Sequence, residues 1–181
     1  MYSSLARYLT GPSWPLLAIL ASVAMLAGAH AFEAIGKMAP CPLCLRQRDV
    51  YWAAIAMAAT GLILWQRGPA GRKLIALNVM LGLVFLTGAV VAGYHAGVEW
   101  DWWQGPAGCS GGGVADITNL DLTAALDRRI ATVSCTEAPW RMFGISMAGY
   151  NAAISAGLAA LSFAASSFVS TIARRNLQAA E

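Results

Sequence analysis

The chain has 181 residues, of which 58% are hydrophobic and only 12% are charged, and its mean hydropathy is +0.57. These values lie outside the range of soluble domains and indicate an integral membrane protein. The formal net charge of +3, without a basic tract, gives no reason to expect a nucleic-acid partner. Four cysteines indicate either an oxidising compartment or a metal site.

Four apolar runs follow one another along the chain: residues 14–32, 43–65, 74–94 and 143–169. Each is long enough to cross a bilayer, which takes about 20 apolar residues in a helix. The sequence therefore predicts an all-α membrane protein. We expect one domain, 1–181, built as a four-helix transmembrane bundle with a long loop at residues 95–142.

Small residues recur at a spacing of four, which is typical of helices that pack closely in lipid: Ala24/Gly28, Gly88/Ala92 and Gly149/Ala153/Gly157. Asn78 and Asn151 lie within apolar runs and are expected to hydrogen-bond between helices. Glu33 and Lys37 follow the first run, and we expect them to form a weak ion pair at the membrane surface.

The basic residues predict the orientation in the membrane. Arg67, Arg72 and Lys73 lie in the short segment between the second and third runs, and further arginines precede the first run and follow the fourth. Cytoplasmic segments are enriched in lysine and arginine, so both termini are expected in the cytoplasm. The loop 95–142 and all four cysteines would then face outward.

A Cys-x-x-Cys pair stands at the start of the second run, within Pro40-Cys41-Pro42-Leu43-Cys44. Proline is well tolerated at the first position of a helix, so the helix is expected to begin at about Pro42. Cys44 then lies in the first turn, where free N–H groups and the helix dipole favour a reactive thiolate. Arg48 follows four residues later on the same face.

The other two cysteines, Cys109 and Cys135, lie in the long loop, and glycines follow Cys109. Apolar residues at helical spacing after residue 121 predict a short amphipathic helix, lying on the membrane or packed on the bundle. Two cysteine pairs on one side of a membrane can exchange electrons by thiol–disulfide exchange. A zinc site is the alternative, but the second pair lacks the spacing of a zinc ribbon, so no metal is expected.

Taken together, these features resemble the DsbB family. They are Pro-Cys-Pro-Leu-Cys at the start of the second helix, Arg48 one turn further, Tyr94-His95 closing the third helix, and Cys109 and Cys135 in the long loop. Members of that family are bacterial inner-membrane proteins. They oxidise a periplasmic thioredoxin-like oxidase, a DsbA-like protein, and pass the electrons to quinone.

The resemblance implies a role for each matching residue. The reduced partner's thiolate would attack Cys109, and Cys135 would then exchange with Cys41. Cys44 would end as the thiolate facing the quinone, with Arg48 and His95 beside it. The quinone, ubiquinone or menaquinone, is the electron acceptor that the resemblance implies, and the loops that carry the cysteines would be periplasmic.

Three other functions are compatible with parts of the sequence. His30 and His95 both lie near outer helix ends and could ligate a haem in an electron-transfer subunit, although the four cysteines would then be unexplained. A non-catalytic membrane scaffold would hold the cysteines as structural disulfides. An enzyme like the vitamin K epoxide reductases would keep the redox pair and differ in its acceptor.

Overall fold

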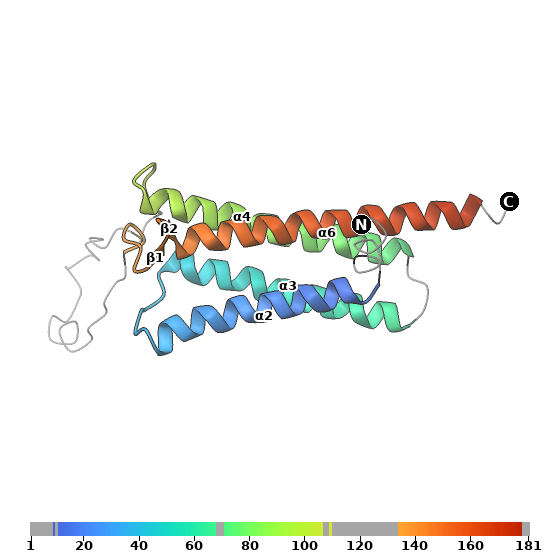
Figure 1. The fold of residues 1–181 in the computed structure, drawn as a ribbon, viewed down its shortest axis with the longest axis horizontal. Helices are drawn as coiled ribbons and strands as arrows, with labels where there is room; N and C mark the ends of the chain where they lie inside the picture. The colour runs from blue at the N-terminus through green and yellow to red at the C-terminus, as the bar shows by residue number, and fades with distance from the viewer. Residues whose placement is uncertain (1–8, 10, 68–70, 107–108, 110–133, 179–181) are drawn as a thin grey trace, which may run out of the picture.

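The computed structural model describes residues 9, 11–67, 71–106, 109 and 134–178. Its four long helices are α2 (Ser13–Ala34), α3 (Pro42–Gln66), α4 (Gly71–Glu99) and α6 (Met147–Gln178). They run side by side along the long axis of the molecule (Figure 1). A small antiparallel hairpin of β1 (Arg141–Met142) and β2 (Ile145–Ser146) precedes α6.

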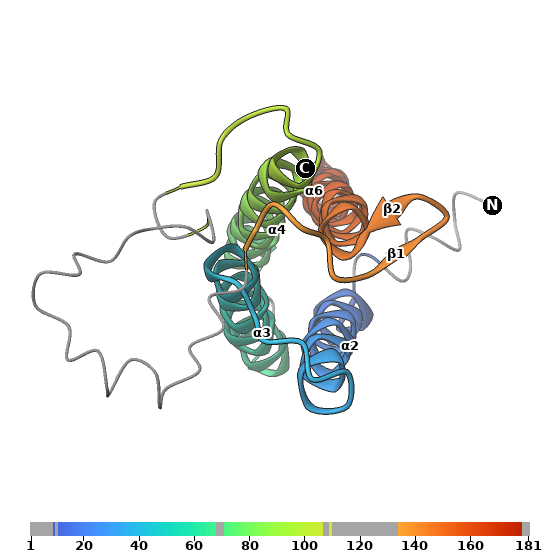
Figure 2. The same ribbon diagram turned by 90° about the vertical axis from the view of Figure 1, so that its left-hand side faces the viewer.

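The four helices do not form a fully closed bundle, because one of the four pairs of neighbouring helices has few contacts. Helix α4 packs most extensively against α6, while α3 packs against α4 and α2 packs against α3. Helix α2 touches α6 at only a few positions, and the two are separated in the end-on view of Figure 2. The bundle is therefore least tightly closed between α2 and α6.

Three of the described helices are long and apolar enough to cross a membrane, over Ser13–Ala34, Arg72–Glu99 and Met147–Ile172. Helix α3 is not among them and carries Arg46, Arg48 and Asp49 near its start. Large apolar side chains on the outer surface are exposed, as a lipid-facing surface requires, for example Leu20, Trp52 and Val90. The chain is thus an all-α membrane protein, as its composition predicts.

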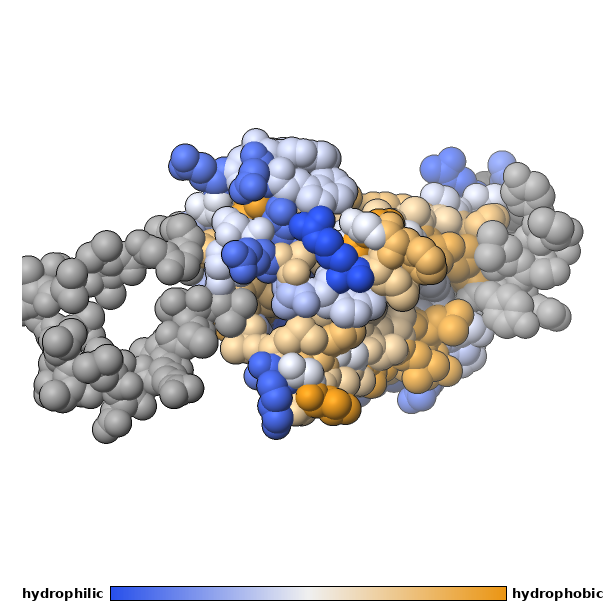
Figure 3. Space-filling view, turned by 60° about the vertical axis from the view of Figure 1, so that its left-hand side comes forward, coloured by the Kyte–Doolittle hydropathy of each residue, from blue (hydrophilic) through white to orange (hydrophobic). Residues whose placement is uncertain are grey.

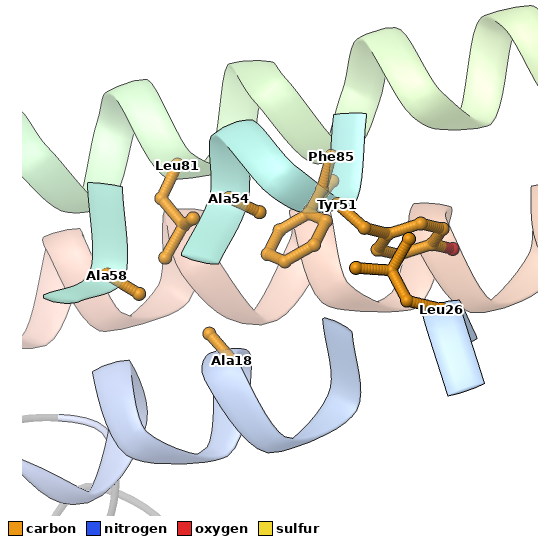
Figure 4. Packing of buried hydrophobic residues seen from close by; sticks show 8 residues of the cluster. Ala18, Leu26, Tyr51, Ala54, Ala58, Leu81 and Phe85 are labelled. Atoms are coloured by element: carbon orange, nitrogen blue, oxygen red, sulfur yellow. The ribbon is translucent and has the colours of Figure 1, made fainter. Parts of the chain in front are cut away.

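Apolar residues cover the flank of the molecule, and hydrophilic residues gather at the end that faces the viewer in Figure 3. Inside, small and large side chains from several helices fit together (Figure 4). Alanines at positions 18, 54 and 58 let helices approach closely, and Leu81 and Phe85 of α4 fill the space between them. This packing holds α3, which carries Cys44 and begins after Cys41, against α2, α4 and α6.

The small-residue pattern is only partly realised as close packing. A Cβ on Gly88 would lie 2.9 Å from Val50 Cγ1 and 3.3 Å from Ser155 Oγ, so α4 needs a glycine there to approach α3 and α6. Gly28 and Gly157 have no such neighbour within 4 Å. Gly28 instead lines a cavity described below.

Several helix boundaries differ from the prediction, among them the end of α6, which lies at Gln178 rather than at residue 169. Helix α4 continues to Glu99, so His95 lies within a helix and the loop begins later than residue 95. The last helix begins at Met147 rather than residue 143, because the chain turns at Phe143 and Gly144, both with positive φ. The predicted amphipathic helix after residue 121 lies outside the described residues.

Candidate active site

The start of α3 is built by the Cys-x-x-Cys segment itself. Pro42 occupies the first helical turn, and Cys41 is the N-cap with extended backbone angles, φ −76° and ψ 165°. The backbone N–H of Cys44 donates to Cys41 Sγ over 3.2 Å, so a sulfur takes the role that an oxygen plays in most N-caps. The prediction that the helix begins at Pro42, with Cys44 in its first turn, is confirmed.

Cys41 and Cys44 are free thiols here, and Cys41 donates to Cys44 Sγ over 2.8 Å. Cys41 is only 3% exposed, while Cys44 is partly exposed. The hydrogen bond to Cys44 and burial together raise the pKa of the Cys41 thiol above its usual range. The two sulfurs of the pair are therefore chemically distinct, and Cys41 is the one that retains its proton.

The two loop cysteines form a disulfide, Cys109–Cys135, with a Cα–Cα distance of 4.9 Å. Both are buried, and the N–H of Cys135 donates to the carbonyl of Cys109 over 2.9 Å. Cys135 Sγ, Cys41 Sγ and a ring nitrogen of His95 all lie within 4.8 Å of one another. The structure thus brings the two cysteine pairs together, and Cys135 is the loop sulfur that faces Cys41.

His95 of α4 is buried between the cysteines and a chain of polar side chains. Its Nε2 lies 3.6 Å from Cys41 Sγ, and its Nδ1 lies 2.9 Å from Gln47 Nε2. Asn151 Nδ2 of α6 donates to Gln47 Oε1, and the hydroxyl of Tyr51 donates to Asn151 Oδ1. The expectation that Asn151 hydrogen-bonds between helices is confirmed, because this series of hydrogen bonds connects α6 to α3 and α4.

Glu99 lies one helical turn after His95 on α4. Its Oε1 is 3.8 Å from His95 Nε2, and its side chain is only 3% exposed. No hydrogen-bond partner is present for its buried Oε2 among the described residues. A buried carboxyl group beside a histidine and two thiols is a polar feature that apolar packing does not require.

Arg48 points inward, in contrast to the exposed Arg46. Its Nη1 donates to Glu33 Oε2 of α2 over 2.7 Å, and its Nη2 donates to the carbonyl of Ala29 over 3.4 Å. The predicted pairing of Glu33 with Lys37 is therefore wrong: Glu33 binds Arg48, which approaches from the neighbouring helix. A guanidinium has five N–H donors, so these two bonds do not exhaust it.

A cavity of about 320 Å³ lies beside these residues, between α2, α3 and α6. Its wall is mostly apolar, and the polar groups that reach it include Cys44, Arg48 and His95. The volume and the mixture of an apolar wall with a few polar groups are those of a small-molecule site. The cavity is open to the outside, and its α2 wall includes Ala24, Gly28 and Phe32.

Sequence reasoning missed Gln47, Tyr51 and Glu99 as parts of the site. Gln47 and Tyr51 lie on the same helical face as Cys44 and Arg48, and Glu99 is four residues after His95. Helical spacing from the predicted site residues could therefore have identified all three. By contrast, His30 is exposed on α2 beside Glu33, and it does not line the cavity that His95 reaches.

Fold and site together define a multi-pass membrane protein with a thiol pair and a disulfide in contact at one end of its helices. The family model for disulfide bond formation protein DsbB matches residues 12–165. The chain belongs to the DsbB family, and it is a disulfide-forming membrane oxidoreductase.

The curated relatives agree with this assignment. The chain is 29% identical to disulfide bond formation protein B of Methylococcus capsulatus over 148 residues, which cover 81% of this chain and 88% of the relative. It is 28% identical to the protein of the same name from Dechloromonas aromatica, over 78% and 83% of the two chains. An uncharacterized protein of Rickettsia prowazekii is 29% identical over 143 residues, which cover 75% of this chain and 76% of the relative. No solved structure gives a significant match to this chain.

Proposed function

We propose that this protein reoxidises a periplasmic thioredoxin-like disulfide oxidase and passes the two electrons to a membrane quinone. The observation that carries the proposal is the contact between the two cysteine pairs, with Cys135 Sγ within 4.8 Å of Cys41 Sγ. The loop disulfide thus lies next to a thiol pair that reaches an apolar cavity. Electrons can therefore pass from a water-soluble donor to the Cys41–Cys44 pair by thiol–disulfide exchange, and from that pair to a lipid-soluble acceptor in the cavity.

The first part of the proposed route is exchange between sulfurs. A partner thiolate attacks Cys109, breaks the Cys109–Cys135 bond and releases Cys135 as a thiolate. Cys135 then attacks Cys41 of an oxidised Cys41–Cys44 pair, so that a Cys135–Cys41 bond forms and Cys44 leaves as a thiolate. The partner's second thiolate attacks the mixed disulfide, so that the oxidised partner leaves and Cys109 becomes a thiolate. Cys109 attacks Cys135, the Cys109–Cys135 bond re-forms, and Cys41 leaves as a thiolate, which makes the Cys41–Cys44 pair fully reduced. The short approach of Cys135 to Cys41 supports this order, and both Cys41 and Cys44 line the cavity.

The second part takes place in the cavity, whose residues suit a quinone ring. A quinone that accepts two electrons and two protons becomes a hydroquinone, while the Cys41 and Cys44 thiols become a disulfide. Arg48 presents a permanent positive charge where negative charge develops on the acceptor's oxygens, and His95 reaches the same cavity. The mostly apolar wall provides the remaining contacts for a lipid-soluble ring.

The loose packing between α2 and α6 supports access from the membrane. These two helices touch at only a few positions, and the cavity has residues of both in its wall. Lipid surrounds the bundle at this level if all four helices span the membrane, which we propose with both termini in the cytoplasm. A quinone could then reach Arg48 laterally without crossing the polar end of the molecule.

The experiment that tests this function is turnover by the purified protein in detergent or lipid. The protein is supplied with a reduced thioredoxin-like dithiol protein and with ubiquinone, menaquinone or vitamin K epoxide in separate reactions. We expect one quinone to be reduced for each dithiol oxidised, and no epoxide to be consumed. Dithiol oxidation with an epoxide and not with either quinone would overturn the proposal, as would no oxidation with any acceptor.

A further inference from the structure

The buried polar chain behind His95 has no part in the route described so far. It links Tyr51, Asn151 and Gln47 to the ring nitrogen of His95 that faces away from the cysteines. We propose that this chain fixes His95 as the tautomer with hydrogen on Nε2, so that His95 donates to Cys41 Sγ when that sulfur leaves as a thiolate. Gln47 and Asn151 are then positioning residues, and the inference rests on the proposed function.

The amide orientations give the first argument. Gln47 Oε1 accepts from Asn151, so the amide NH₂ of Gln47 faces His95 Nδ1 at 2.9 Å. An NH₂ group can only donate, so Nδ1 must accept, and the hydrogen of a neutral imidazole is then on Nε2. Asn151 is held in turn by hydroxyl donors on its Oδ1, from Tyr51 and from Ser155 over 3.3 Å.

The other side of the ring gives an independent argument. Nε2 faces Cys41 Sγ at 3.6 Å and Glu99 Oε1 at 3.8 Å. The S–H of Cys41 is directed to Cys44, so Cys41 offers only lone pairs to the ring. A hydrogen on Nε2 therefore suits this sulfur, whereas a bare nitrogen would face its lone pairs.

The chemistry explains why a donor is needed at Cys41. After the partner has left, the Cys109 thiolate attacks Cys135 in the Cys135–Cys41 bond. The Cys109–Cys135 bond re-forms and Cys41 departs with the electron pair as a thiolate. Cys41 is buried, and its pKa is raised by its neighbour Cys44, so this thiolate is costly without a donor. A hydrogen bond to a charged group is among the stronger ones in proteins.

The test uses Gln47→Met, which keeps the shape of the side chain and removes both polar groups, and Asn151→Leu. Asn78→Leu is the matched control, since Asn78 is another buried asparagine in a membrane helix and is not one of the hydrogen-bonded side chains behind His95. The protein has only two histidines, so ¹⁵N-histidine labelling followed by NMR reports the tautomer of His95 beside that of the exposed His30. The second readout is the amount of Cys135–Cys41 disulfide during turnover with quinone.

We expect the hydrogen on Nε2 in the parent protein and in Asn78→Leu, and a mixture of tautomers in Gln47→Met. The Cys135–Cys41 species should accumulate in Gln47→Met and Asn151→Leu. In both variants kcat should fall about tenfold, because one charge-assisted hydrogen bond to the leaving thiolate is lost. A hydrogen on Nδ1 in the parent protein, or normal kcat in both network variants, would overturn the inference. Parent protein without any quinone turnover would instead refute the proposed function and leave the tautomer result standing.

Discussion

Arg48 of α3 and Glu33 of α2 form an ion pair, with Arg48 Nη1 2.7 Å from Glu33 Oε2. The pair joins the helix that carries the cysteines to the helix that forms the opposite wall of the cavity. Arg48 is only 14% exposed at its side chain, against 39% for Glu33. The ion pair therefore holds the guanidinium toward the cavity and away from the polar surface.

Arg48→Ala is expected to raise the apparent quinone KM about tenfold or more, because it removes the fixed positive charge from the cavity. Arg48→Lys should lose less, since the charge remains although the paired donors do not. The exposed Arg46 gives the control, and Arg46→Ala should leave the quinone KM near that of the parent protein. Equal and small effects at both arginines would mean that Arg48 only contacts lipid head groups.

Glu33→Ala should raise the same KM by about fivefold or less, since partly exposed ion pairs contribute little and the positive charge itself is retained. An effect as large as that of Arg48→Ala would assign Glu33 a direct part in binding the acceptor. The measurement is steady-state quinone reduction at several quinone concentrations with a fixed, saturating dithiol protein.

The sequence was sufficient for the features that depend on local chemistry. Proline at the first helical position determined where α3 begins and so placed Cys44 in its first turn. The four apolar runs correspond to the four long helices. Helical spacing also placed Arg48 on the same face as Cys44, and both line the cavity.

Features that depend on contacts between helices were harder to predict. Glu33 was assigned to Lys37 because they are close in sequence, but the packing of α2 against α3 brings Arg48 closer. The network of Gln47 and Asn151 joins residues that are far apart in sequence, and a single sequence gives no register between the helices. The hairpin at Arg141–Ser146 follows from backbone angles that an apolar run does not reveal.

In the reduced protein, a limiting amount of iodoacetamide at neutral pH should modify Cys44 before Cys41. The pKa of Cys41 is raised by its hydrogen bond to Cys44 and by burial, so Cys41 remains a protonated, unreactive thiol at a pH where free thiols begin to ionise. Peptide mass spectrometry gives the site of modification, and initial modification at Cys41 would contradict the assignment.

Cys135→Ser should accumulate a mixed disulfide between Cys109 and the thioredoxin-like partner. Cys135 is the loop sulfur that faces Cys41, so without it the electrons cannot pass inward from Cys109. Cys109 is buried in the oxidised structure, and the serine variant also lacks the disulfide that holds it there. Non-reducing electrophoresis with the partner present detects the species. A mixed disulfide on Cys41 with none on Cys109 would reverse the proposed order.

A membrane-impermeant maleimide added to intact cells should label Cys109 and Cys135 after mild reduction. A reporter fused after Glu181 should be active only in the cytoplasm, because basic residues flank the end of α6 and the α3–α4 connection. Labelling that requires permeabilised cells would place the cysteines in a reducing compartment, where stable disulfides are rare.

The most direct test of the account is whether the two cysteine pairs react with each other. The double variant Cys44→Ser/Cys109→Ser leaves only Cys41 and Cys135, and Cys41→Ser/Cys109→Ser leaves Cys44 and Cys135 as the matched control. Mild oxidation of the purified protein, followed by peptide mass spectrometry, should give an intramolecular Cys41–Cys135 disulfide in the first variant, since the two sulfurs lie within 4.8 Å. The control should form much less. No Cys41–Cys135 bond in a folded protein, or an equal yield in both variants, would contradict the proposed path of the electrons.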